Sequence, residues 1–272
     1  MNCESRKRRF SPSGLTHRLY DMTSPAIASL LRRWRWDVQR LDRSGITHRD
    51  LEHDLSRLVL SPSPLVFDVG ANKGQTIELM RRVFPFCELH AFEPSQDLAR
   101  SLHERYSSCH VVIESMALGA RDGICRFLKY DNNELSSFLS LTQNSDNPFT
   151  GVDLIATEEV RVTTIDSYCA TNRISAIDIL KTDTQGFDLE VLKGAARLFS
   201  IGAVRLVLAE VLFIPMYESQ CKPGELIDWL GAQGFALVGL YEQVRLQRAL
   251  SWATACFINR LGPPSTSERG LP

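Results

Sequence analysis

One stretch of the chain constrains its fold more than any other, the run from Leu65 to Thr76. It opens with a short apolar segment that contains an acid, Asp68, and it then carries two glycines four residues apart, Gly70 and Gly74. A helix-forming segment follows directly, so the pattern predicts a buried parallel strand, a tight glycine-rich turn and a crossover helix. The turn would lie at the carboxyl end of the strand, where open α/β sheets bind ligands. We therefore expect an α/β fold with a binding site at this turn.

A second acid supports this interpretation. The next strand-like run ends at Glu93, roughly twenty residues after Gly70, and a carboxylate at such a position can accept both hydroxyls of a ribose. The glycine spacing is neither G-x-G-x-x-G nor that of a phosphate-binding loop. Asp68 would repel a phosphate, but it suits a cation such as the ammonium group of a sulfonium ligand's amino acid. The pattern favours a nucleoside with a positively charged tail.

Composition narrows the functional class. Among 272 residues, 31 Lys and Arg nearly balance 32 Asp and Glu, which does not indicate a nucleic-acid-binding protein. The seven cysteines are scattered without a C-x-x-C pair, as expected for free thiols in the cytoplasm. The sequence contains no apolar run that could span a membrane and no signal-peptide segment. The basic start, Arg6–Arg9, leaves open a transit peptide or peripheral contact with anionic lipid.

We predict four parts of the chain. They are a disordered basic tail over 1–25, an N-terminal helical cap over 26–61, the main domain over 62–260 and a disordered tail over 261–272. The cap would contain a helix from Asp50 to Leu60, and it carries Trp34 and Trp36, which either contact a substrate or a membrane or pack in the core.

The main domain does not alternate regularly between strands and helices. Residues 120–176 form an insertion, with strands predicted at 124–130 and 159–166 around a polar turn and a long loop. An insertion of this length inside a compact domain is more often functional than idle. After the last helix, two strands are predicted at 235–241 and 253–259, which suits a closing antiparallel hairpin.

The pattern Asp68-x-Gly70-x-x-x-Gly74 with Glu93 resembles the first motif of class I S-adenosylmethionine (SAM) methyltransferases. Three further segments resemble the FkbM family within that class: the Ser136-Ser137 pair, the run 162–168 and the run 181–190. The resemblance implies a Rossmann-like, seven-stranded class I methyltransferase sheet with helices on both faces. The sequence departs from the family pattern at two positions. Gln185 stands where Glu is frequent, and Asp188 begins a shifted acidic pair with Glu190.

The resemblance also implies roles for individual residues. SAM would be bound by Asp68, Gly70, Asn72, Gly74, Glu93 and Ala117. Asp183 and Glu210 would be the catalytic acids, although Asp183 could instead cap the following helix. Ser136, Ser137 and Gln185 would contact the substrate, with turn capping as the alternative for the two serines. A magnesium ion could be shared by Asp183, Glu210 and a substrate diol, but no metal site is established.

The expected function is SAM-dependent O-methylation of a sugar, glycolipid or polyketide-type metabolite. The partner would be a small-molecule or glycan acceptor, and the oligomeric state stays open. Two alternatives remain: an NAD(P)-dependent oxidoreductase, which the missing middle glycine disfavours, and a non-catalytic nucleoside-binding module.

Overall fold

The computed structural model describes residues 45–106 and 110–260. The predicted tails, and the part of the predicted cap before residue 45, lie outside the described residues. The chain forms two units, Met1–Thr47 and His48–Pro272, and every element below belongs to the second.

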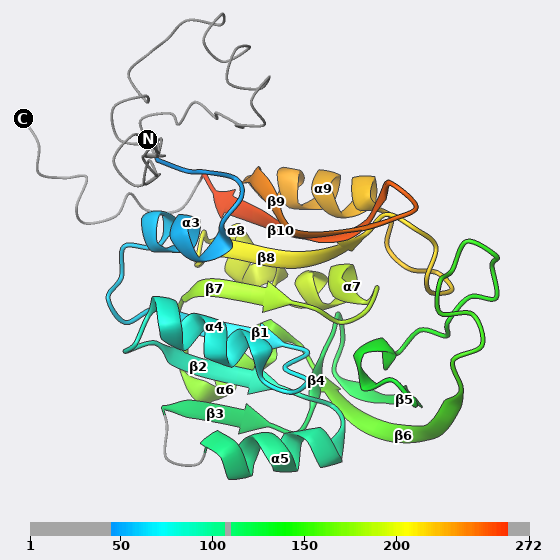
Figure 1. Ribbon diagram of the computed structural model, residues 1–272. Helices are drawn as coiled ribbons and strands as arrows, with labels where there is room; N and C mark the ends of the chain where they lie inside the picture. Colours follow the sequence, from blue (N-terminus) through cyan, green and yellow to red (C-terminus); the bar gives the residue numbers. More distant parts are fainter. Residues whose placement is uncertain (1–44, 107–109, 261–272) are drawn as a thin grey trace, which may run out of the picture. The chain divides into compact units, whose positions relative to one another are not determined.

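A seven-stranded sheet forms the centre of this unit, in the order β3-β2-β1-β7-β8-β10-β9 (Figure 1). Its strands are β1 (Leu65–Val69), β2 (Glu88–Phe92), β3 (Val111–Glu114), β7 (Ile177–Thr182), β8 (Val204–Leu212), β9 (Phe235–Leu246) and β10 (Ala249–Asn259). The first five are parallel, whereas β10 runs antiparallel to β8 and β9. The predicted seven-stranded sheet with a closing hairpin is therefore confirmed.

The strand register decides where the site residues lie. Val69, the last residue of β1, pairs with Phe92 of β2 and with Thr182 of β7. The three strands end level with one another, so the residues that follow them, Gly70, Glu93 and Asp183, emerge at one edge of the sheet.

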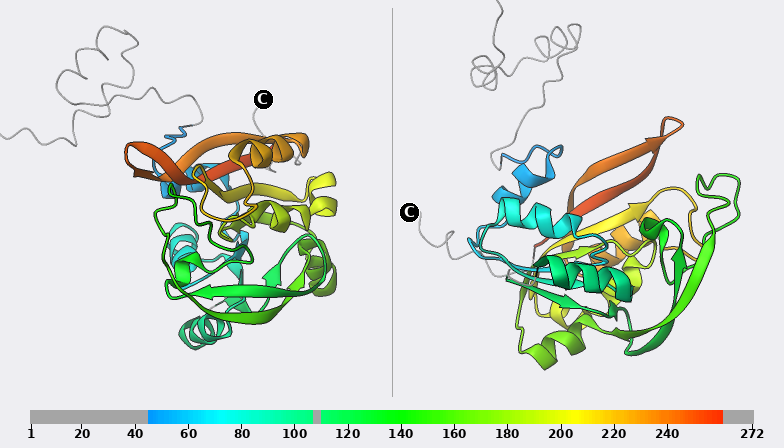
Figure 2. Two further views of the ribbon diagram at one scale, coloured as in Figure 1. Left: turned by 90° about the vertical axis from the view of Figure 1, so that its right-hand side faces the viewer. Right: turned by 60° about the horizontal axis from the view of Figure 1, so that its bottom comes forward.

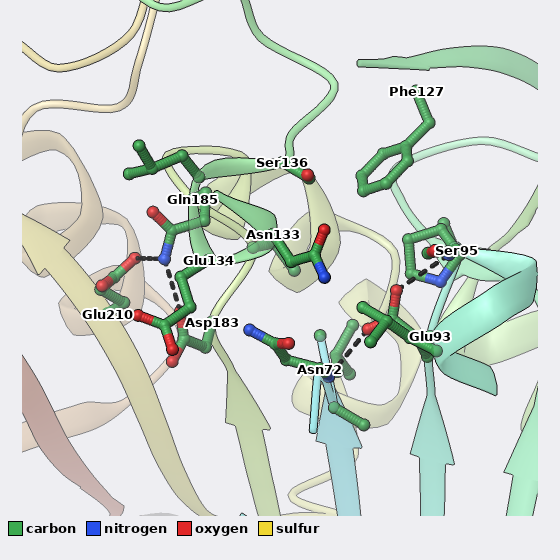
Figure 3. A pocket seen from close by; sticks show the side chains of 18 of the residues that line it. Asn72, Glu93, Ser95, Phe127, Asn133, Glu134, Ser136, Asp183, Gln185 and Glu210 are labelled. Carbon is green, nitrogen blue, oxygen red and sulfur yellow. Dashed lines mark hydrogen bonds between the residues drawn. The ribbon is translucent and has the colours of Figure 1, made fainter. Parts of the chain in front are cut away.

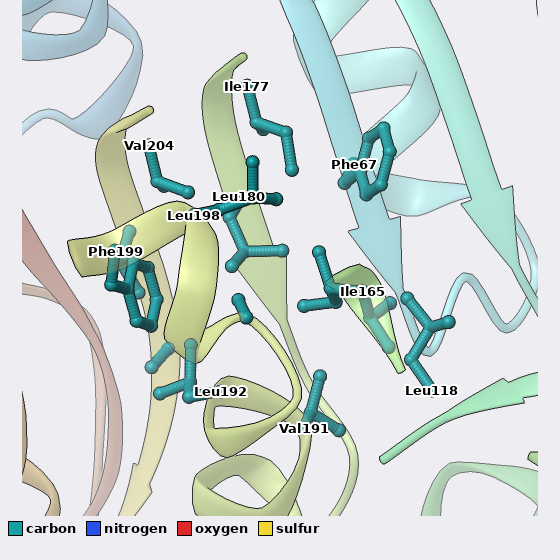
Figure 4. Packing of buried hydrophobic residues seen from close by; sticks show 14 of the residues in the cluster. Phe67, Leu118, Ile165, Ile177, Leu180, Val191, Leu192, Leu198, Phe199 and Val204 are labelled. Atoms are coloured by element: carbon teal, nitrogen blue, oxygen red, sulfur yellow. The ribbon is translucent and has the colours of Figure 1, made fainter. Parts of the chain in front are cut away.

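Helices cover both faces of the sheet. They are α3 (Leu51–Leu58), α4 (Gln75–Val83), α5 (Gln96–Tyr106), α6 (Ile165–Asn172), α7 (Asp188–Lys193), α8 (Ala196–Ser200) and α9 (Pro223–Ala232). Successive strand residues point to opposite faces, so Phe67 and Leu180 join a buried cluster with α6, α7, α8 and α9. Figure 4 shows part of this cluster. Val66 and Leu208 join a second cluster with α3, α4 and α5 on the other face.

The described part of the predicted cap is α3. The Asp50 side chain caps this helix by accepting a hydrogen bond from the backbone N–H of His53 at 3.1 Å. Leu55 is buried in the cluster shared with α4, and the buried carboxylate of Asp54 accepts a hydrogen bond from the Tyr241 hydroxyl at 2.8 Å. This helix therefore packs as a layer on the α4 side of the sheet.

The insertion and the short strand just before it form a second, three-stranded sheet in the order β4-β6-β5; Figure 2 shows two further views of it. Its elements are β4 (Ala117–Leu118), β5 (Gly123–Tyr130), the 3₁₀ turn η2 (Asn133–Leu135) and β6 (Leu154–Thr163). The predicted strand at 159–166 is displaced, because the Thr164 side chain accepts from the backbone N–H of Ser167 at 2.9 Å and starts α6.

The closing hairpin is longer than the predicted strands at 235–241 and 253–259. Gln247 and Arg248 both adopt positive φ angles, 47° and 72°, between β9 and β10. A two-residue turn of this kind matches the twist of the flanking strands, which allows pairing to continue to the tip.

Candidate functional site

A pocket of about 390 Å³ lies near the ends of β1, β2, β7 and β8, and its wall contains residues of the main sheet and of the insertion. Its volume falls in the range of small-molecule sites. Predicted site residues in its wall are Gly70, Asn72, Glu93, Ala117, Ser136, Asp183, Gln185 and Glu210 (Figure 3). No residue of α3 is part of this wall.

The glycine turn brings two strand ends close together. Gly70 has a φ of 87°, and a Cβ added there would lie 2.1 Å from the carbonyl oxygen of Asp183. Only glycine therefore allows the end of β1 to pass the end of β7 at this distance. Asn72 follows with a φ of 47°, and its Oδ1 is buried without a hydrogen-bond partner among the described residues. Asn72 thus lines the pocket while its Oδ1, unpaired within the described part of the chain, is an acceptor buried beneath the pocket surface.

Glu93 is fixed by the backbone around it. One carboxylate oxygen accepts from the N–H of Asn72 and the other from the N–H of Ser95, both at 2.8 Å (Figure 3). The side chain is almost wholly buried, and burial raises the pKa of Glu93 to about 7. Each oxygen keeps a second lone pair, so the carboxylate can accept two further hydrogen bonds from a ligand.

Three predicted site residues lie behind the pocket wall. Asp68 is fully buried and pairs in register with Lys181; burial raises the pKa of Asp68 to about 6, against the effect of that lysine. Gly74 starts α4 with a φ of 89°, and a Cβ there would lie 2.9 Å from the Tyr106 hydroxyl. The Ser137 hydroxyl donates to the backbone carbonyl of Gln185 at 2.9 Å. These residues support the residues of the wall instead of forming it.

The two predicted catalytic acids meet through an amide. The Nε2 group of Gln185 donates to Oδ1 of Asp183 and to Oε2 of Glu210, each at 3.0 Å (Figure 3). On the far side of Asp183, Nζ of Lys181 donates to Oδ2, also at 3.0 Å. The structure thus brings together all three of the predicted residues and adds a lysine that the prediction omitted.

The surroundings of the two acids separate their pKa values. Burial and the negative charge of Asp183 raise the pKa of Glu210 well above its ordinary value. Burial would also raise the pKa of Asp183, but the adjacent Lys181 outweighs burial and holds that pKa below the ordinary value. Asp183 therefore loses its proton at a lower pH than Glu210 does, an arrangement that assigns different roles to the two groups.

The other half of the wall comes mainly from the insertion. Asn133 and Glu134 of η2 line it, together with Phe127 of β5, Phe149 and, from the hairpin, Trp252. The Phe149 and Trp252 ring centroids are 6.1 Å apart. Sequence reasoning expected the insertion to be functional but did not select these residues, because aromatic residues outside a periodic pattern give no signal of where they will meet.

Two further observations concern metals and membranes. Within residues 45–106 and 110–260, no three His, Cys, Asp or Glu side chains are grouped so that they could hold a metal ion. Over the same residues, no helix has the length and apolar character needed to cross a membrane.

The strand order, the glycine turn after β1 and the acid after β2 define a class I methyltransferase fold. The family model of the methyltransferase FkbM domain matches residues 68–237. The chain belongs to this family, which confirms the resemblance seen in the sequence.

Several known proteins are similar to the chain. The 2-O-methyltransferase NoeI of Sinorhizobium fredii (strain NBRC 101917 / NGR234) is 21% identical over 207 residues, which cover 74% of this chain and 83% of NoeI. The crystal structure of methyltransferase FkbM from Methylobacillus flagellatus KT aligns with a TM-score of 0.46 at 17% identity; the match covers 72% of this chain but only 44% of that one. Magnesium protoporphyrin IX methyltransferase (ChlM) from Synechocystis PCC 6803, solved with bound SAM, aligns over 93% of this chain and 100% of its own, with a TM-score of 0.41 and 12% identity.

Proposed function

We propose that the protein is a SAM-dependent O-methyltransferase. The proposal rests on one observation: a single pocket contains Glu93, which follows β2, and a pair of acids joined by an amide. Of these acids, Asp183 follows β7 and Glu210 lies within β8. Glu93 suits a ribose, and the acid pair suits an alcohol that must lose a proton.

The pocket residues fit SAM at three points. The free lone pairs of Glu93 would accept the ribose hydroxyls, and the Asn72 side chain, whose Oδ1 has no partner among the described residues, would rotate to accept from the ammonium group of the methionine part. Ala117, Leu118 and Phe127 give the pocket an apolar side that suits adenine. When bound, SAM supplies a methyl group on a sulfonium, which transfers by direct displacement.

The chain's own residues would orient the acceptor and remove its proton. Alignment accounts for most of the acceleration of a displacement reaction, and a general base adds about 10²–10⁴-fold for a weakly nucleophilic hydroxyl. We assign the base to Glu210 and the fixed anion beside it to Asp183, because Lys181 neutralises only Asp183. Glu210 accepts the proton only when it is ionised, so the rate should rise as the pH increases through its raised pKa.

The acceptor side of the pocket supports a hydroxylated substrate with an apolar surface. Phe149, Met216 and Trp252 offer an apolar wall, while Asn133 and Ser136 offer hydrogen bonds. A sugar, glycolipid or polyketide-type metabolite has both characters. Similarity to NoeI, which is described as a 2-O-methyltransferase, supports transfer to oxygen.

Calorimetric titration of the full chain with S-adenosylhomocysteine tests the proposal. We expect saturable binding that Glu93→Ala abolishes and Glu93→Gln weakens, since the amide keeps the size of the side chain but has one acceptor oxygen where the carboxylate has two. NAD is the control ligand. Binding of NAD in place of the homocysteine nucleoside would favour an oxidoreductase, and absence of any nucleoside binding would favour a non-catalytic module. Methyl transfer from labelled SAM to a panel of sugars and lipids would then define the acceptor.

A further inference from the structure

The backbone at Gln185 directs its side chain over the acid pair. Gln185 and Gly186 adopt consecutive positive φ angles, 54° and 87°. A Cβ at Gly186 would lie 3.1 Å from Cβ of Gln220, and the Ser137 hydroxyl holds the Gln185 carbonyl. A non-glycine residue with positive φ persists only where its surroundings hold it, so the position of Gln185 is imposed by the fold.

The orientation of the Gln185 amide is also set. The hydroxyl of Tyr217, a residue that is only 3% exposed, lies 3.0 Å from Oε1 of Gln185 and 3.0 Å from the backbone carbonyl oxygen of Leu135, and its single hydrogen can be donated to only one of the two. What sets the orientation is the acid pair: Nε2 faces the acids, and its two hydrogens serve one carboxyl group each. The reverse orientation would place the amide oxygen against the Asp183 carboxylate, where it would be repelled.

A bridging magnesium ion does not fit this arrangement. Such an ion would lie between Oδ1 of Asp183 and Oε2 of Glu210, where Nε2 of Gln185 already lies. The other oxygen of Asp183 accepts from the Lys181 ammonium, which would repel a divalent cation. Magnesium also requires near-octahedral oxygen ligands, and an amide nitrogen and an ammonium group provide none.

We propose that Gln185 is a positioning residue that takes the place of a bridging divalent cation, holding the Asp183 and Glu210 carboxyl groups side by side through one amide nitrogen. The consequence for catalysis rests on the proposed function: methyl transfer at this site needs no metal ion. The contact geometry of Gln185 with the two acids does not depend on that function.

The isosteric variant Q185E tests this inference directly, because it converts the amide into a third carboxylate between the other two. We expect Mn²⁺ to bind Q185E at least about tenfold more tightly than the wild type, since cation affinity rises with the number of charged ligands. Mn²⁺ should raise the unfolding temperature of Q185E and not that of the wild type. The double variant Q185E/D183N should lose the effect. Q243E is the matched control, because it makes the same chemical change on β9 without contact to the acid pair.

Two results would overturn the inference: Mn²⁺ binding to the wild type that D183N abolishes, or a folded Q185E with no gain in Mn²⁺ affinity. Should Q185E fail to fold, the wild-type titration decides alone, and absence of binding at millimolar Mn²⁺ supports the inference. Calorimetry with S-adenosylhomocysteine on the same samples separates the two proposals. If the chain does not bind the nucleoside, the proposed function is wrong, but the Mn²⁺ titration still tests the role of Gln185.

Once an acceptor is known, Q185L adds a kinetic test. Leucine fills the space but cannot donate to either acid. We expect kcat to fall about 10²-fold with KM for SAM unchanged, and wild-type activity to persist in EDTA. A role in folding alone would lower the amount of active protein without changing its dependence on metal or pH.

Discussion

At the residue scale, the acid pair is asymmetric in a way that mutation can measure. Glu210 is the acid that keeps its proton to the higher pH, and E210Q has the shape and charge of that neutral form, so we expect the unfolding free energy to change by less than about 1 kcal/mol. D183N leaves the buried Lys181 without its partner at 3.0 Å. Because the Asp183 side chain is 39% exposed, we expect a loss of about 2 kcal/mol, below that of a fully buried pair.

Chemical denaturation of the two variants gives the comparison, with activity as a second readout. Both should lose methyl transfer, since both belong to the proposed catalytic pair. Equal stability losses would mean that the negative charge is shared evenly and that the assignment of the base to Glu210 is wrong.

Glu93 gives the site a dependence on pH. Its pKa is raised to about 7 by burial in the unliganded protein, and ribose hydroxyls would donate to the ionised form and so lower that pKa. The nucleoside therefore binds the ionised form better, its affinity should increase as the pH rises from 5.5 to 8, and binding should release a proton below pH 7. Calorimetry in buffers of different ionisation enthalpy measures that proton. In E93Q fewer protons should be released on binding. If proton release is unchanged in E93Q, the proton comes from Asp68, whose pKa is about 6.

At the element scale, the contact between the ends of β1 and β7 should be intolerant of any side chain. G70A places a Cβ within 2.1 Å of the Asp183 carbonyl oxygen and also strains a φ of 87°, so we expect it to cost about 2 kcal/mol or more. G123A in β5 is the control, because a Cβ there meets nothing within 4 Å. Thermal unfolding of both variants tests this. Similar losses would show that β1 and β7 can separate without cost.

The insertion should contribute separately to the two halves of the pocket. Phe127 lies on the side of Ala117 and Leu118, whereas Phe149 pairs with Trp252. We expect F127A to weaken S-adenosylhomocysteine by about tenfold, the loss expected for one well-packed aromatic contact. F149A should leave that affinity unchanged and raise KM for the acceptor. Equal effects on the nucleoside would mean that the two halves are not distinct.

At the scale of the whole molecule, three residues of the pocket wall could be predicted because they follow parallel strands. Gly70, Glu93 and Asp183 each come directly after a strand, and parallel strands end at one edge of a sheet. Asp68 lies within its strand, where side chains alternate between faces, so its carboxylate lies beside Lys181 behind the wall. Trp252 and Phe149 come into contact only when the hairpin and the insertion fold. Neither segment has a residue spacing from which this contact could be predicted.

The smaller sheet has its own buried cluster, formed by Ala117, Phe127, Val160 and Val162. In the proposed binding mode this cluster supports the adenine side of the pocket, whereas the acceptor side is lined by η2, Phe149 of the long loop and Trp252 of the hairpin. Substitutions in η2 and the loop after it can change the shape of the acceptor wall without altering the register of β1, β2 and β7. The architecture therefore lends itself to divergence and to laboratory evolution of acceptor choice, because new substrates can be explored with substitutions in η2 and the loop after it while the ends of β1, β2 and β7 keep the proposed donor site.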